Sequence, residues 1–350
     1  MSCTYCYVYH GADETWKRLP ATFSDATRVR LAERIGEHAL RHRPPVISIV
    51  LHGGEPLLAG HDSVSATLAE ISSAVPPKTR VRFGVQTNGI LLDARFLEIF
   101  HKYDVRVGVS LDGGRDANDR HRTYVNGNGS FDRATAGLRL LAKPENREIY
   151  SGLLCTIDVR NNPVQVYEDL LAFEPAVIDL LLPHGNWTNP PPRPAGAMSY
   201  AQWLIAVFDT WYDAPVARTR IRLFESIMMR LLGGQSTTEA VGGEQPGIVV
   251  IETDGSYEQT DSLKSTVDGA AATGLTVETS SLDDVLAYLA TPEPLAAECL
   301  SCPVLAACGG GLLAHRFKDG RFDNPSAYCD DLYQVIRHIE GRLTADLADR

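Results

Sequence analysis

Six of the seven cysteines lie in two closely spaced sets near the two ends of the chain. The first set is Cys3-Thr4-Tyr5-Cys6, and the second follows the pattern Cys-x2-Cys-x5-Cys with a fourth member further on. Thiolates at such spacings bind zinc or iron–sulfur clusters, and a lone CxxC also suits thiol exchange. The second set consists of Cys299, Cys302, Cys308 and Cys329. The sequence therefore predicts two thiolate sites, whereas the isolated Cys155 is expected to be a small core residue.

Three short polar motifs each follow a predicted buried strand. They are His52-Gly53-Gly54-Glu55-Pro56, Gln86-Thr87-Asn88-Gly89 and Ser110-Leu111-Asp112-Gly113. One such motif alone would pass for a turn, because Gly, Asn and Asp are common turn residues. Three of them after successive strands indicate a shared site, since parallel barrels place their active sites at the carboxyl ends of the strands.

The elements that must position these motifs alternate between strands and helices. Ser24 is expected to cap a helix that carries Leu31, Ile35 and Leu40. Buried strands are expected near 46–51, 81–86, 105–111, 150–157 and 177–182, and further helices near 63–74, 94–103, 131–142 and 164–173. This alternation predicts a parallel α/β sheet or barrel.

After residue 185 the pattern changes. A proline-rich run at 189–194 is expected to be an extended linker, followed by helices near 200–212 and 220–232. The segment 248–258 contains Asp254-Gly255, which is typical of a hairpin turn. A helix near 327–343 is expected to close the chain.

The composition argues against two classes of partner. A net charge of −11 does not favour general nucleic-acid binding. No stretch approaches the roughly 18 apolar residues of a membrane span, and no signal segment begins the chain. The expected location is therefore the cytoplasm.

Over nearly its whole length the chain resembles the radical S-adenosylmethionine (SAM) enzymes. The resemblance implies a partial (β/α)6 TIM-like barrel whose CxxxCxxC loop holds a catalytic 4Fe–4S cluster, with SAM on the fourth iron. It implies that Cys3 and Cys6 ligate this cluster and that Gly53, Gly54, Glu55 and Pro56 form the loop that receives the SAM amino group. It further implies that Gln86, Asn88 and Ser110 lie near the SAM ribose and tail, and that Arg122 lies near the SAM carboxylate. Judged from the residues alone, Arg122 is equally well a solvated surface charge.

The sequence departs from this family in one respect. The CxxxCxxC spacing requires a cysteine four residues before Cys3, which lies two residues upstream of Met1. The strand that should precede the loop is also not found, since we count five strands where the family has six. We therefore expect a truncated chain or a misplaced start, and the alternative is a protein that has lost its catalytic cluster.

The C-terminal cysteines resemble the SPASM and twitch extensions of peptide-modifying radical SAM enzymes. The fuller SPASM pattern holds two auxiliary clusters, but Thr260 stands where its upstream cysteine would be. The resemblance therefore implies one auxiliary 4Fe–4S cluster held by the four C-terminal cysteines. It also implies that Asp261 is a catalytic base, although the residue alone would equally suit a turn or a cap.

The motifs after Cys308 resemble those of FxsB-type maturases of ribosomally made peptides. This implies that the protein joins an aromatic ring to a β-carbon of a precursor peptide, forming a cyclophane, with an electron donor such as flavodoxin or ferredoxin. The alternatives are an anaerobic sulfatase-maturase-like enzyme that forms formylglycine, or a binding protein without a cluster. The expected domains are a radical SAM partial barrel at 1–188, a linker and helical connector at 189–245, and an auxiliary-cluster domain with a closing helix at 246–350.

Overall fold

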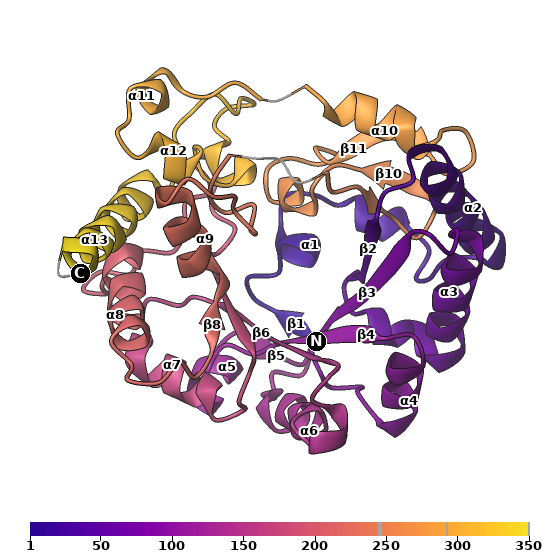
Figure 1. Cartoon of the computed structure of the whole chain (residues 1–350), viewed down its shortest axis with the longest axis horizontal. Coiled ribbons are helices and arrows are strands. Elements are labelled where there is room, and N and C mark those ends of the chain that lie inside the picture. The colour runs from indigo at the N-terminus through magenta and orange to yellow at the C-terminus, as the bar shows by residue number, and fades with distance from the viewer. Residues whose placement is uncertain (244–246, 292, 349–350) are drawn as a thin grey trace.

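A computed structural model describes residues 1–243, 247–291 and 293–348 of the chain (Figure 1). Its main sheet has six parallel strands in the order β2-β3-β4-β6-β7-β8. Their bounds are β2 Val46–Leu51, β3 Arg80–Thr87, β4 Val105–Ser110, β6 Tyr150–Thr156, β7 Val177–Leu181 and β8 Arg220–Ile221. All five predicted strands are confirmed, and the curved sheet with helices outside it is a partial barrel (Figure 1).

The sixth strand, β8, corrects one prediction. Residues 220–221 were expected to begin a helix, but they pair with β7, and helix α9 (Arg222–Leu231) starts only after them. Ile221 is fully buried beside Ile178. Two residues are too few to produce an alternating pattern, so this strand could not be predicted. This strand follows the linker and lies at the edge opposite β2, so it does not replace the strand that was expected before the cysteine loop.

The predicted barrel helices are confirmed, with shifts of a few residues at their ends. They are α2 Asp25–His42, α3 Gly60–Ala74, α4 Ala94–Lys102, α6 Phe131–Leu141 and α7 Pro163–Leu171, with the short α5 Arg115–Asp119 between β4 and α6. The Ser24 side chain accepts a hydrogen bond from the Thr27 amide and caps α2, as expected. Leu31 and Ile35 face the core, but Leu40 is exposed, because the neighbouring Ala39 occupies the buried face.

The C-terminal part adds helices and a second, three-stranded sheet. The expected hairpin is β9 (Val250–Ile251) and β10 (Ser256–Glu258), with Gly255 at φ 88° in its turn. A third strand, β11 (Ala272–Thr276), pairs with β10 and was not anticipated. The helices are α8 Tyr200–Tyr212, α10 Leu282–Leu289, α11 Ala297–Leu300, α12 Leu305–Cys308 and α13 Cys329–Ala348.

The C-terminal helix shares the hydrophobic core of the barrel. Leu332 and Val335 of α13 belong to the same buried cluster as Leu204 of α8 and Ile178 of β7. The division at 188/189 therefore separates segments that pack together, and the boundary at 245/246 lies outside the described residues. The three-domain division stays a prediction. Among the described residues, no helix is both long and apolar enough to cross a membrane.

Candidate active site

A buried network of hydrogen bonds connects the loop of the first cysteine pair to the end of the barrel. Strand β1 (Ser2–Cys3) pairs with β5 (Arg122–Thr123), and the next residues carry Tyr5 inward. The Tyr5 hydroxyl donates to Oδ2 of Asp112 at 2.6 Å and accepts from NH1 of Arg122 at 2.8 Å. The backbone amide of Thr156, the last residue of β6, donates to Oδ1 of Asp112 at 3.0 Å. Tyr5 therefore links the cysteine loop to the carboxyl ends of β4 and β6.

The two charged side chains of this hydrogen-bond network are almost fully buried. Asp112 is 4% exposed and Arg122 is 6% exposed, so the surface-charge interpretation of Arg122 is wrong. Burial raises the pKa of Asp112, although the Arg122 guanidinium opposes this effect. The Nε atom of Arg122 is buried without a hydrogen-bond partner among the described residues. An unpaired cationic donor at this position fits a carboxylate ligand such as that of SAM.

The three strand-end motifs meet at the same edge of the sheet. Glu55 accepts hydrogen bonds from the Thr87 hydroxyl at 2.7 Å and from the Asn88 amide at 2.8 Å. The Gln86 side-chain amide donates to the Ser110 hydroxyl at 2.9 Å. The loop after β2 is thus tied to the loop after β3, and the end of β3 is tied to the end of β4. The sequence interpretation brought these residues together correctly, and their contacts with SAM stay a prediction.

Glycine is required in the loop after β2 for two reasons. Gly53 has φ +56°, which L side chains rarely adopt. A Cβ on Gly54 would lie 1.8 Å from the Tyr9 hydroxyl, so the ring of Tyr9 packs directly on this backbone. Pro56 begins a short 3-10 helix (Pro56–Ala59) that turns the chain away from the site. Tyr9 therefore lies beside the loop that the resemblance assigns to the SAM amino group.

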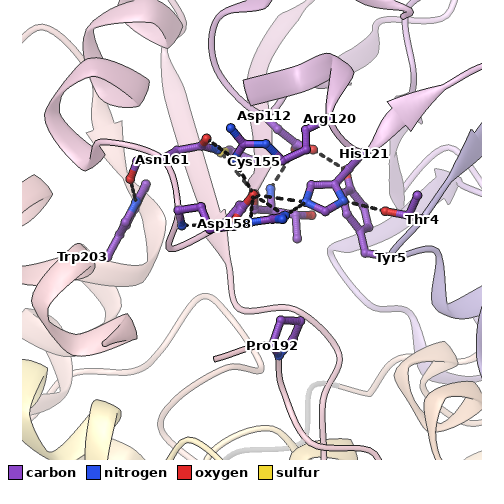
Figure 2. Close-up of polar contacts among 12 residues, drawn as sticks. Thr4, Tyr5, Asp112, Arg120, His121, Cys155, Asp158, Asn161, Pro192 and Trp203 are labelled. Carbon is purple, nitrogen blue, oxygen red and sulfur yellow. Dashed lines mark hydrogen bonds and ion pairs between the residues drawn. The ribbon is translucent and has the colours of Figure 1, made fainter. Parts of the chain in front are cut away.

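A second polar network, centred on Asp158, was not anticipated (Figure 2). Its carboxylate accepts hydrogen bonds from Arg120 at 2.9 Å and from Arg160 at 2.8 Å, and its Oδ2 lies 3.2 Å from Nε2 of His121. Nδ1 of His121 lies 2.5 Å from the Thr4 hydroxyl in the cysteine loop. Burial alone would raise the pKa of Asp158, but the bonds from His121 and Arg160 outweigh it and lower that pKa.

The network was missed because its members are far apart in sequence. Thr4 and His121 are separated by 117 positions, and the segment around Asp158 resembles an ordinary loop after a strand. The available signal was the position of Asp158, two residues beyond the carboxyl end of β6. This is the same type of position that the three recognised motifs occupy. Asp158 is therefore connected to the cysteine loop through His121.

Asp261 faces the first cysteine pair. It begins a short 3-10 helix (Asp261–Ser265) but makes no capping hydrogen bond there. Instead its Oδ2 accepts from the hydroxyl of Tyr7, next to Cys6, at 2.5 Å, and lies 3.9 Å from Nδ1 of His52. The Asp261 side chain is 29% exposed. These contacts place the Asp261 carboxylate beside Tyr7 and His52, and its role as a base stays a prediction.

Two histidines extend this cluster toward the C-terminal part. The ring of His184 lies 4.3 Å from that of Tyr7 and 5.9 Å from that of His315, measured between centroids. His315 is 3% exposed, and neither of its ring nitrogens has a partner among the described residues. Burial lowers the pKa of His184 to about 4, although Asp261 opposes the shift, and burial also lowers the pKa of His315. Both rings are therefore neutral at neutral pH.

The four C-terminal cysteines lie together around α12, at the start of α13 and beside Arg316. Their thiols are close enough to raise one another's pKa, and burial raises that of Cys308 to about 11. No three of the four sulfur atoms lie within 4.8 Å of one another, a spacing that only His38, His42 and Asp283 reach among the described residues. Four thiols are a donor set that either zinc or a 4Fe–4S cluster takes, so the auxiliary cluster stays a prediction.

The comparison with known proteins identifies the first part of the chain. Residues 1–151 match the model of the Radical SAM superfamily. A cysteine-type anaerobic sulfatase-maturating enzyme of Clostridium novyi (strain NT) is 26% identical over 269 residues, which are 75% of this chain and 70% of that protein. A serine-type anaerobic sulfatase-maturating enzyme of Bacteroides thetaiotaomicron is 22% identical over 367 residues, covering 97% of this chain and 86% of that protein.

The solved structures extend the likeness to the whole fold. The structure described as native anSMEcpe with bound AdoMet aligns with a TM-score of 0.79 at 20% identity, covering 100% of this chain and 96% of that chain. Streptococcus suis SuiB bound to precursor peptide SuiA aligns with a TM-score of 0.59 at 14% identity, covering 93% and 72%. Residues 1–151 therefore match a radical SAM domain, the whole chain shares the fold of these structures, and the protein is an enzyme. The predicted fold class and enzyme class are confirmed.

Proposed function

We propose that the protein is a maturase that oxidises a side chain of a peptide, and that Asp261 accepts the proton that this oxidation releases. The observation that carries the proposal is the contact of Asp261 with Tyr7, which places a carboxylate beside the loop of Cys3 and Cys6. Relatives that are named sulfatase-maturating enzymes, and a neighbour that holds a precursor peptide, support a peptide substrate.

The residues of this chain fit the cofactors to different degrees. Cys3 and Cys6 offer two of the three thiolates of a SAM-binding cluster, and the unpaired Nε of Arg122 fits the SAM carboxylate. When bound, the cluster and SAM supply the removal of a hydrogen atom from the substrate. The four C-terminal cysteines would hold an auxiliary cluster, which supplies a further redox group.

Asp261 is suited to accept a proton for three reasons. It is partly exposed, so a substrate can reach it, and the hydroxyl of Tyr7 orients it with a short hydrogen bond. Its neighbour Glu239 has a pKa raised by burial and by the charge of Asp261. His184 is neutral, so the charge beside the substrate is carried by carboxylates. A carboxylate that takes a proton becomes neutral and leaves no extra positive charge there.

The first candidate product is formylglycine, made from a cysteine or serine of the peptide. The relatives of both types that cover most of this chain favour it. The second candidate is a cyclophane, a bond between an aromatic ring and a β-carbon. It is supported by the FxsB-like motifs after Cys308 and by Thr260, which stands where the two-cluster pattern has a cysteine. In both reactions the peptide loses one hydrogen atom, one proton and one electron. From a cysteine this gives a thioaldehyde, and water then replaces the sulfur, which leaves as hydrogen sulfide, to give formylglycine.

The test uses protein expressed from its full reading frame, with SAM and a reductant. Its probes are a sulfatase-derived peptide with the target cysteine or serine, and any small peptide encoded beside the gene. Asp261→Asn should still form 5′-deoxyadenosine, while modified peptide falls by roughly two to four orders of magnitude, the usual contribution of a general base. Trapping with a hydrazide separates an aldehyde product from a crosslink, which does not react.

Two control variants make the test specific. Glu239→Gln removes the other carboxylate of the cluster, so a larger loss there than in Asp261→Asn would name Glu239 as the base. Asp268→Asn alters an exposed aspartate that accepts from the Glu14 amide at 2.8 Å, and it should change neither product. Equal loss of deoxyadenosine and modified peptide in Asp261→Asn would place Asp261 in folding or SAM binding.

A further inference from the structure

A cluster of two histidines and one aspartate lies outside the active site, between α2 and α10. His38 and His42 are one turn apart on α2, and their ring centroids are 4.6 Å apart. Nδ1 of His38 lies 2.9 Å from Oδ1 of Asp283, in the first turn of α10. Nε2 of His42 lies 2.8 Å from the same oxygen. The three potential ligand atoms lie within 4.8 Å of one another, and the described residues contain no other such trio.

We propose that His38, His42 and Asp283 form a binding site for a divalent metal ion of the zinc class, and that the bound ion clamps α10 onto α2. Two imidazoles four residues apart on one helix face, with a carboxylate from a second element, are a ligand set that zinc takes. Three protein ligands leave a fourth position for water.

The surroundings of the trio suit the entry of an ion. The side chain of His42 is 47% exposed and those of His38 and Asp283 are 20% and 26% exposed, so the site opens to solvent. Hydrogen bonding from His38, together with that from Arg41 and His42, lowers the pKa of Asp283 to about 2, which keeps the carboxylate ionised. An ion that binds here displaces the ring protons that now face Asp283.

One neighbouring group competes with the ion. NH1 of Arg41 lies 2.5 Å from Oδ2 of Asp283, while both histidines face Oδ1. The side chain of Arg41 is 67% exposed and can turn into solvent when an ion arrives. Its positive charge nevertheless opposes that of the ion at this distance. The Arg41 guanidinium should therefore weaken metal binding, which gives the proposal a test with a defined sign.

The site also lies where an additional link has a structural effect. In α10 only Val285 is fully buried. Beyond the trio, Arg34 of α2 donates to the backbone oxygen of Val277, just before α10, at 2.8 Å. Leu282 and Leu289 are only partly buried against the core, so polar contacts add to what keeps this helix docked. A metal ion shared by α2 and α10 would fasten the C-terminal part to the barrel.

The experiment titrates zinc into the cluster-loaded protein in competition with a fluorescent chelator, and follows the melting temperature in parallel. We expect one zinc ion bound per chain at this site, with a higher melting temperature. His38→Ala and His42→Ala should each weaken this binding by roughly a hundredfold, as expected for the loss of one of three ligands. Arg41→Ala should tighten it.

The matched control is His61→Ala, because His61 pairs with Asp93 at 3.0 Å in the same manner but without a second histidine. This variant should bind zinc as the original protein does. Cobalt provides a second readout, since binding at this site should add no thiolate-to-metal absorption band. Zinc binding that survives both histidine variants but is lost in Cys302→Ala would overturn the proposal. So would weaker binding in Arg41→Ala.

Discussion

The hydroxyl of Tyr5 should stabilise the protein more than any ordinary surface hydrogen bond. Tyr5→Phe removes one oxygen atom that serves both Asp112 and Arg122, each almost fully buried. Hydrogen bonds to charged groups contribute about 1.5–3 kcal/mol each, so the loss of both has an upper limit of about 3–6 kcal/mol. Asp112 keeps its bond from the Thr156 amide, and Arg122 can move toward Asp112. We therefore expect a loss of about 2–3 kcal/mol.

The assay is urea unfolding of the cluster-free, reduced protein at neutral pH, followed by tryptophan fluorescence. The matched control is Tyr150→Phe, because the Tyr150 hydroxyl is buried without a partner among the described residues. Removing it should leave the free energy of unfolding unchanged or raise it. Iron content after reconstitution gives a second readout, since a looser cysteine loop should retain less of the catalytic cluster.

A double-mutant cycle with Asp112→Asn tests the connection itself. If Tyr5 acts through Asp112, the cost of Tyr5→Phe should fall by at least about 0.5 kcal/mol in the Asp112→Asn background. The reasoning is refuted if Tyr5→Phe costs as little as Tyr150→Phe. It is equally refuted if the effects of Tyr5→Phe and Asp112→Asn simply add.

Three further predictions concern Cys308, Gly309 and His184. Cys308→Ser should abolish binding of the auxiliary cluster and make the C-terminal part sensitive to proteolysis. If the unaltered protein binds stoichiometric zinc and no iron, the cluster assignment is wrong. Gly309→Ala should lower the free energy of unfolding by roughly 3 kcal/mol or more, because its Cβ would lie 1.9 Å from the backbone nitrogen of Gly243. Gly320→Ala, with φ +82° and no atom within 4 Å, should cost only about 1–2 kcal/mol. His184 has a pKa of about 4 when folded and 6.5 when unfolded. Between these values the unfolded chain binds more protons, so the stability of the protein falls as the pH is lowered. Between pH 7 and pH 5 its contribution should drop by about 1–2 kcal/mol, and His184→Asn should flatten this dependence in urea unfolding.

Local patterns in the sequence predicted most of the barrel, because the five predicted strands are short, largely apolar runs and the helices between them have an apolar face. Glu55, Gln86, Asn88 and Ser110 were placed together correctly, since carboxyl ends of neighbouring parallel strands must lie side by side.

What escaped prediction depends on contacts between distant residues. The pattern around Arg122 does not distinguish a buried arginine from an exposed one, because its burial depends on Tyr5 and Asp112. Strands β8 and β11 were missed for a related reason. Two or five residues form a strand only when a partner edge is already present, and the partner of β8 lies more than forty positions earlier in the chain.

The late arrival of β8 has a consequence for how the protein is made. Ile178 on β7 pairs with Ile221 on β8, so β7 remains the open edge of the sheet until residue 221 leaves the ribosome. At about 5–20 residues per second, this interval lasts roughly 2–8 s. An uncovered hydrophobic edge invites pairing with other nascent chains. The proline-rich segment and α8 are synthesised in this interval, and α8 packs against α7. Synthesis of the linker and α8 therefore sets how long this edge of the half-made barrel stays uncovered.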